Sequence, residues 1–194
     1  MTELELLIQQ IKKCNICASD LPFAPNPIIQ LCQNAKILII GQAPGKVAHN
    51  ISKPFLDKSG ERLRMWLDVT NEQFYNKDNF AIMPMAFCFP GKNNTNSGDK
   101  APPSICQQTW HNKIREQLGK VELTLLVGQY AAKQYLTEFS NLTNAIKNNE
   151  VHKGEVIVLP HPSPRNNIWL SKNKWFETKT LPILRQRIKD ILIN

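Results

Sequence analysis

The chain has 194 residues, 42% of them hydrophobic, and its 24 Lys and Arg against 16 Asp and Glu give a formal net charge of +8. This length and composition suit one domain with a sizeable core, and no apolar run approaches the roughly 20 residues of a membrane-spanning helix, which excludes a membrane protein. The positive charge favours an anionic partner, most simply nucleic acid.

The N-terminal residues 3–13 place apolar side chains at helical spacing and predict a first helix. This charged segment lacks the apolar stretch of a secretory signal peptide, so we expect a cytoplasmic protein. Residues 18–34 are proline-rich and form an irregular connection. The apolar run 36–40 then predicts a strand buried on both faces, which stops at Gly41.

The rest of the chain alternates predicted strands and helices. We expect Ser59 to cap the helix that follows the first strand. The predicted strands cover 80–83, 121–127 and 155–159, and the predicted helices cover 59–69, 104–118, 129–137, 141–148 and 173–192. Each connection is long enough for a crossover. The order therefore predicts an α/β fold in one domain, 1–194: a three-layer αβα sandwich around a four-stranded, mainly parallel sheet.

Ligands bind beyond the carboxyl ends of the strands in such sheets. The loops expected at that edge cover residues 41–45, 84–103, 128–130 and 160–167. The first is Gly41-Gln42-Ala43-Pro44-Gly45, whose glycines let the backbone approach a ligand closely. It is neither a P-loop nor a dinucleotide fingerprint, and taken alone it does not exclude an ordinary strand-to-loop turn.

The last of these loops reads His161-Pro162-Ser163-Pro164-Arg165-Asn166-Asn167. Its two prolines stiffen the chain, so His161 would be presented in a fixed orientation. Ser163, Arg165 and Asn166 can donate hydrogen bonds to phosphate oxygens. The alternative is a rigid turn with a surface histidine, but the position at the end of a parallel strand favours a function.

Four of the five cysteines form a possible ligand set. Cys14 and Cys17 make a C-x-x-C at the end of the first helix, Cys88 follows the second strand, and Cys106 opens the next helix. Four thiolates can hold a [4Fe–4S] cluster or a zinc ion, and buried thiols without metal are the other alternative. Cys32 is left over and is expected to pack.

The segment Pro54-Phe55-Leu56-Asp57 lies between the first loop and the following helix. Phe55 could stack on a base, and Asp57 could orient a water molecule or stabilise positive charge on a sugar. Core packing of Phe55 and N-terminal capping by Asp57 are the structural alternatives. His49, upstream, is a weaker candidate.

Taken in this order, these motifs resemble the uracil-DNA glycosylase superfamily, and most closely its iron–sulfur branch, family 4, from about Cys14 to the C-terminal helix. The resemblance implies that Cys14, Cys17, Cys88 and Cys106 hold a structural [4Fe–4S] cluster. It also implies that the flipped nucleotide enters a pocket at the carboxyl ends of the strands.

The resemblance further assigns roles to residues. Phe55 would stack on the base, and His161 would donate a hydrogen bond to uracil O2 as negative charge develops there. The 41–45 loop would hold the base edge and the attacking water. The 161–167 loop would clamp phosphates, with Arg165 as the wedge that fills the gap left by the flipped base.

Two positions depart from the family pattern. Gln42 stands where family 4 proteins usually carry Glu; its amide can position water but cannot act as a base. Pro84 stands where the uracil-reading Asn falls, and Asn50 or Gln129 is a candidate substitute.

We therefore expect a base-excision repair glycosylase that hydrolyses the N-glycosidic bond of uracil or another damaged base. It would bind DNA as a monomer, with no membrane and no obligate protein partner. The alternatives are a non-catalytic or weakly active binder of damaged or single-stranded DNA, and a nucleoside hydrolase-like enzyme.

Overall fold

The computed structural model describes residues 1–95 and 98–193. Its central sheet has four parallel strands in the order β2-β1-β3-β4. The strands are β1 (Ile37–Ile40), β2 (Phe80–Ile82), β3 (Leu123–Val127) and β4 (Val156–Leu159). In the middle of the sheet Ile37 pairs with Phe80 on one side and with Leu123 on the other. All of β1 is buried, because both faces of the sheet are covered.

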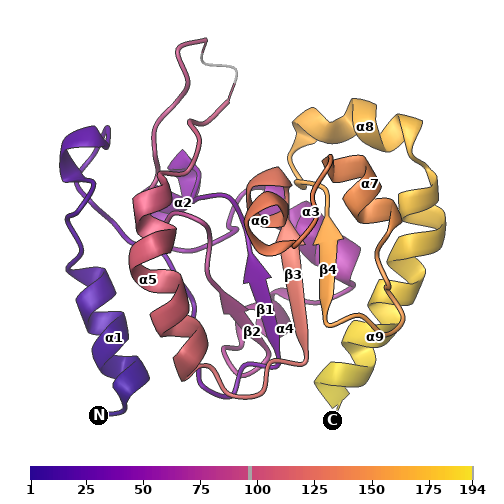
Figure 1. Ribbon diagram of the computed structural model, residues 1–194, viewed down its shortest axis with the longest axis horizontal. Coiled ribbons are helices and arrows are strands. Elements are labelled where there is room, and N and C mark those ends of the chain that lie inside the picture. Colours follow the sequence, from indigo (N-terminus) through magenta and orange to yellow (C-terminus); the bar gives the residue numbers. More distant parts are fainter. Residues whose placement is uncertain (96–97, 194) are drawn as a thin grey trace.

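Helices cover both faces of the sheet (Figure 1). They are α1 (Glu3–Lys12), α2 (Lys46–Ile51), α3 (Lys58–Leu67), α4 (Asn71–Tyr75), α5 (Ser104–Gln117), α6 (Gln129–Tyr135), α7 (Leu142–Lys147), α8 (Asn167–Lys172) and α9 (Leu181–Ile193). α1 packs against α5, and α3 packs against α9. Figure 1 shows α5 and α6 on the near face of the sheet and α3 on the far face. The predicted α/β sandwich with a parallel sheet is confirmed.

The strand order indicates where along the edge of the sheet a ligand would bind. The chain crosses from β1 to β2 on one side, and then returns past β1 to place β3 on its other side. The loops after β1 and β3 therefore diverge, and a crevice between such loops is the usual ligand position in α/β sheets. Among the described residues, no helix is both long and apolar enough to cross a membrane.

Three local differences from the predicted elements have physical reasons. α2, α4 and α8 are too short to show helical periodicity, although α4 carries a capping box between Thr70 and Gln73. The predicted C-terminal helix contains a π-helical turn at Phe176–Thr180, where aromatic rings from α8 and this segment pack edge to face. The prediction that Ser59 caps α3 is wrong, because Asp57 occupies the N-cap.

Candidate active site at the carboxyl edge of the sheet

The first loop is joined to the segment that follows β2. Met85 N donates to the Gly41 carbonyl (2.9 Å), and Ala86 N donates to the Gln42 carbonyl (3.1 Å). These bonds extend the β1–β2 pairing past the ends of both strands. The backbone of Gly41 and Gln42 is thereby held rigidly at the edge of the sheet, as a ligand-binding loop requires.

Phe55 is held against Gly41 in an unusual backbone conformation. Its φ is +52°, in the left-handed region that non-glycine residues seldom adopt. Its carbonyl accepts hydrogen bonds from Arg64 Nη1 (2.9 Å) and Tyr75 Oη (3.2 Å). A Cβ added at Gly41 would lie 3.1 Å from Phe55 Cζ, so the ring covers the bare backbone of the loop. Strain of this kind persists where the surroundings fix it, and it is common at ligand sites.

One carboxylate oxygen of Asp57 makes a hydrogen bond that caps a helix, and the other faces the first loop. Oδ1 accepts a hydrogen bond from Gly60 N (2.9 Å), which caps α3. Oδ2 would lie 3.7 Å from a Cβ added at Gly45. Asp57 can therefore cap α3 and also act on a substrate, because the two roles use different oxygen atoms.

His161 is fixed by its own loop. Ser163 N donates to His161 Nδ1 (3.2 Å), and Asn166 Nδ2 donates to the His161 carbonyl (2.7 Å). With Nδ1 accepting, the proton of the neutral ring lies on Nε2. Burial lowers the pKa of His161, the Asp57 and Asp99 carboxylates oppose that shift, and Arg165 adds to it. The ring is therefore neutral at pH 7 and can donate from Nε2.

The remaining residues of the 161–167 loop lie at the same edge. Ser163 Oγ accepts a hydrogen bond from Arg165 N (3.3 Å). Arg62, which lies on α3, donates from Nη1 to the Ser163 carbonyl (3.1 Å). The Arg165 side chain is directed toward Gly98, with Nη1 2.8 Å from where a Cβ on Gly98 would lie. The candidate phosphate donors thus belong to the same edge as His161 and Asp57.

The backbone carbonyl of Pro84 is hydrogen-bonded to a buried histidine that the sequence pattern did not single out. His111 Nε2 donates to the Pro84 carbonyl (3.0 Å), and Tyr135 Oη donates to His111 Nδ1. Burial lowers the pKa of His111 to about 4, so the ring is neutral. Proline offers no side-chain hydrogen bond, and its carbonyl is already paired. Within residues 1–95 and 98–193, no side-chain hydrogen bond ties the two candidate substitutes, Asn50 and Gln129, to this position.

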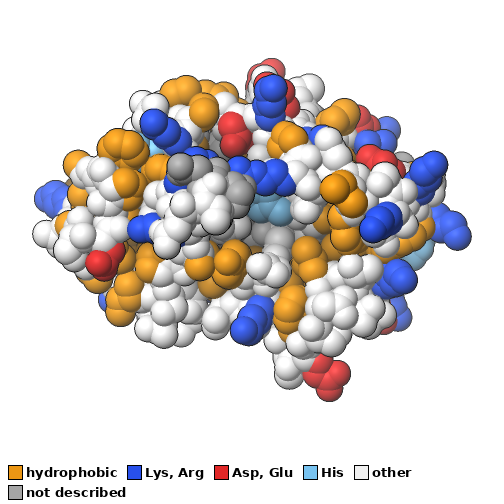
Figure 2. Space-filling view, turned by 90° about the horizontal axis from the view of Figure 1, so that it is seen from above, with side chains coloured by type: hydrophobic (Ala, Val, Ile, Leu, Met, Phe, Trp, Pro, Cys, Tyr) orange, Lys and Arg blue, Asp and Glu red, His pale blue; other side chains and the backbone are white. Residues whose placement is uncertain are grey.

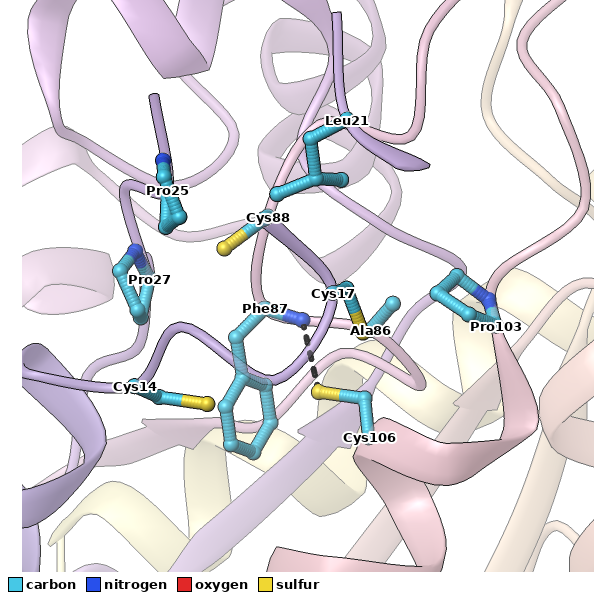
Figure 3. Close-up of a pocket in the computed structure, with 10 residues that line it drawn as sticks. All are labelled: Cys14, Cys17, Leu21, Pro25, Pro27, Ala86, Phe87, Cys88, Pro103 and Cys106. Carbon is cyan, nitrogen blue, oxygen red and sulfur yellow. Dashed lines mark hydrogen bonds between the residues drawn. The ribbon is translucent and has the colours of Figure 1, made fainter. Parts of the chain in front are cut away.

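The four candidate ligand cysteines line one pocket (Figure 3). Cys14 and Cys17 lie after α1, Cys88 lies after β2, and Cys106 lies in the first turn of α5. Phe87 N donates to Cys106 Sγ (3.4 Å). Cys32 lies outside this pocket, is partly exposed and donates to Asp78 Oδ1 (3.0 Å).

The pocket has the chemistry of a site for a soft metal group. Its other lining residues are apolar or proline, and burial raises the pKa of Cys88 to about 11 and that of Cys106 to about 12. The Cys88 and Cys106 thiols are therefore neutral unless a cation displaces their protons. In the described part of the chain, no three His, Cys, Asp or Glu side chains are close enough to hold a single ion.

Figure 2 looks down on the carboxyl edge of the sheet. A histidine side chain is visible near the centre of this face, with Lys and Arg side chains on several sides. Lys92–Asp99 and Lys153–Glu150 are the ion pairs recorded among the described residues. Most of the 24 basic side chains are thus not neutralised by an ion pair within the described chain, which suits a surface that meets phosphates.

The arrangement of the motifs agrees with a comparison against known families. The model of the uracil DNA glycosylase superfamily matches residues 29–185, from just before β1 into α9. The match includes the loops at 41–45 and 161–167 and the segment that carries Phe55 and Asp57. The chain belongs to the uracil DNA glycosylase superfamily.

Proposed function

We propose that the protein is a DNA glycosylase that excises a damaged base by hydrolysing its N-glycosidic bond. The observation that carries this proposal is the state of His161. A neutral imidazole with its proton on Nε2 is a hydrogen-bond donor held at the edge where a flipped base would enter. Such a donor stabilises the base as it leaves with negative charge, and it needs no proton transfer.

The other residues of the site complete the mechanism. The flipped base would stack on Phe55, whose ring lies over Gly41. As the glycosidic bond breaks, its electron pair goes to the base and positive charge develops on the sugar. Asp57 Oδ2 faces Gly45 and would stabilise that charge. The Gln42 side chain would position the attacking water; its Nε2 donates to the Lys100 carbonyl (3.4 Å), leaving Oε1 as an acceptor.

The family reads uracil through an Asn side chain, and this chain has Pro84 at that position. We therefore expect a different base specificity. Pro84 has no side-chain hydrogen-bonding group, and its backbone carbonyl is paired with His111. We propose that the enzyme accepts uracil and other deaminated or damaged bases with less discrimination than a site that reads the base edge through an amide.

The test is a panel of oligonucleotides, each with one uracil, hypoxanthine, xanthine or other modified base, in single and double strands. Strand scission at the lesion after alkali is the expected result. Scission of none of these substrates would contradict the enzymatic proposal.

A non-catalytic binder of damaged DNA is the second candidate. It is favoured by Gln42, whose side chain cannot act as a base, and by Pro84, whose side chain cannot form a hydrogen bond to the edge of a base. Tight, salt-dependent binding of the lesion oligonucleotides without scission would support this candidate instead.

We also propose that Cys14, Cys17, Cys88 and Cys106 hold a structural [4Fe–4S] cluster. The support is the chemistry of the donor set: four thiols from three segments face one apolar pocket, and a backbone N–H already donates to one sulfur. Such a cluster would tie α1 to the start of α5, and it would take no part in bond breaking.

Iron and acid-labile sulfide analysis of anaerobically purified protein tests the cluster, together with its visible spectrum. Broad visible absorption that is lost in Cys88→Ser and retained in Cys32→Ser is expected. Bound zinc in a colourless sample, or a sample free of metal, would contradict it.

A further inference from the structure

The segment after Cys88 forms a hairpin, described at residues 91–95 and 98–100, that rises above the carboxyl edge of the sheet (Figure 1). Lys100 N donates to the Gly91 carbonyl (2.8 Å), and Asn93 N donates to the Gly98 carbonyl (2.8 Å). Lys92 and Asp99 face each other in an antiparallel bridge. These pairs fix the base of the hairpin, and with it the position of Asp99.

Asp99 is brought to the candidate active site by this hairpin. Its Oδ2 and the Oδ2 of Asp57 would lie 3.9 Å and 3.7 Å from one point, a Cβ added at Gly45. Two carboxylate oxygens from segments about forty residues apart therefore border the same space in front of the first loop. Asp99 Oδ1 is bound by Lys92 Nζ (2.6 Å), which orients the carboxylate.

Two further contacts hold the hairpin on the site. Gln42 Nε2 donates to the Lys100 carbonyl (3.4 Å). Arg165 lies beside Gly98, with its Nη1 2.8 Å from where a Cβ on Gly98 would lie. The hairpin is therefore clamped between the first loop and the 161–167 loop, and both loops belong to the proposed active site.

We propose that Asp99 is a catalytic residue, the second carboxylate that stabilises positive charge on the sugar of the flipped nucleotide. This inference rests on the proposed glycosylase function. Lys92 binds Oδ1 of Asp99, and Oδ2 borders the space in front of Gly45, where it could stabilise a cationic sugar. Gln42 supplies no charge to the first loop, and Asp99 supplies it from a different segment.

Binding of two abasic-site analogues tests this role without requiring turnover. One oligonucleotide carries a cationic pyrrolidine in place of the sugar, and the other carries a neutral tetrahydrofuran. We expect the wild-type protein to prefer the cationic analogue. The Asp99→Asn variant should lose about tenfold of that preference, because the change removes a negative charge beside the sugar. It also releases Lys92 from its ion pair, an effect on phosphate binding that both analogues share. Its affinity for the neutral analogue should be unchanged or tighter.

Asp68→Asn is the matched control, since Asp68 is exposed at the opposite end of α3 and has no recorded ion pair among the described residues. It should keep the wild-type preference. Retention of the full preference by Asp99→Asn overturns the role of Asp99 alone. A wild-type protein that neither cleaves the lesion panel nor prefers the cationic analogue overturns the proposed function, and the role of Asp99 with it.

Discussion

The polar side chains at the site divide their atoms between structure and chemistry. His161 accepts a backbone N–H at Nδ1, which sets the proton on Nε2. Asp57 accepts a backbone N–H at Oδ1, which turns Oδ2 toward Gly45. In each case a local backbone bond fixes the orientation of the group that would meet the substrate, so less ordering is needed when the substrate binds.

Replacement of His161 by Ala should lower the rate of base excision at least about 100-fold, because the donor acts on charge that develops only in the transition state. The dissociation constant for a lesion oligonucleotide should change by less than about threefold. Single-turnover kinetics and equilibrium binding measure the two effects separately. His152→Ala, at an exposed histidine in a turn, is the control. Equal losses of rate and affinity would assign His161 to ground-state binding.

Two substitutions of Asp57 separate capping from catalysis. Asn caps helices as well as Asp, so Asp57→Asn should leave the free energy of unfolding nearly unchanged, whereas Asp57→Ala should lose about 1 kcal/mol. Both should slow base excision strongly. Urea denaturation and single-turnover kinetics provide the comparison, with Ser59→Ala as a control that changes neither. A fully active Asp57→Asn variant would limit Asp57 to capping.

At the scale of elements, the first turn of α3 and the Phe55 segment form one unit. The helix begins so close to Phe55 that a Cβ on Gly60 would lie 1.7 Å from the Phe55 carbonyl oxygen. Arg64 of the same helix donates to that carbonyl and lies over the Phe74 ring. The aromatic that would stack on the base is thus positioned by a helix terminus and not by a flexible loop.

Replacement of Gly60 by Ala should therefore displace Phe55 or the start of α3. We expect a loss of more than about 2 kcal/mol in the free energy of unfolding, because the added carbon meets backbone and not a flexible side chain. Thermal unfolding of this variant beside Ser59→Ala, one position earlier, measures the effect. A Gly60→Ala protein as stable as the wild type would show that the approach of helix and segment can relax freely.

For the whole molecule, the carboxyl edge is the face on which the net positive charge of +8 would meet DNA. Arg165 and Lys92 lie at the carboxyl edge, and the opposite edge carries the end of α9 (Figure 1). DNA that docks on the carboxyl edge would release counterions from the phosphates that it places there.

Salt dependence locates this surface. The logarithm of the association constant for DNA falls linearly with the logarithm of the salt concentration. Arg165→Ala should make this slope less steep by about one, whereas Lys189→Ala on α9 should leave it unchanged. Titrations at several salt concentrations with a lesion duplex measure both slopes. Equal reductions in the two variants would mean that DNA does not select the carboxyl edge.

The buried His111 links the stability of the whole fold to pH. Its ring joins the segment after β2 to α5 and α6 through Pro84 and Tyr135. The pKa of His111 is about 4 in the fold against 6.5 in its unperturbed state. Between these values the unfolded chain binds more protons, so the stability present above about pH 6.5 is lost as the pH falls toward 4.

This loss should reach about 3 kcal/mol at most. Urea denaturation at pH 7 and at pH 4.5 measures it, and His111→Gln, which does not titrate, should show a flatter dependence. A variant with the same pH dependence as the wild type would place the titrating group elsewhere.

The local pattern of the sequence was enough for the order of strands and helices and for the edge that carries the site. β1, β2, β3 and β4 are short apolar runs, and apolar runs are buried wherever the chain folds. Because parallel strands end at the same edge, the Gly/Pro-rich loops after them were expected to meet. Short helices such as α2 were missed because five or six residues carry too little periodicity.

Only the tertiary structure decided which atoms face the site. The contact of the Phe55 ring with Gly41, the His111–Pro84 bond and the approach of Asp57 and Asp99 to Gly45 each join segments whose relative placement no spacing fixes. The sequence determines which segments are buried and how strands alternate with helices, because both depend on residues that are close together in the chain. The meeting of His161, Asp57 and Asp99 at one edge depends on contacts between loops, and the packed sheet brings those loops together.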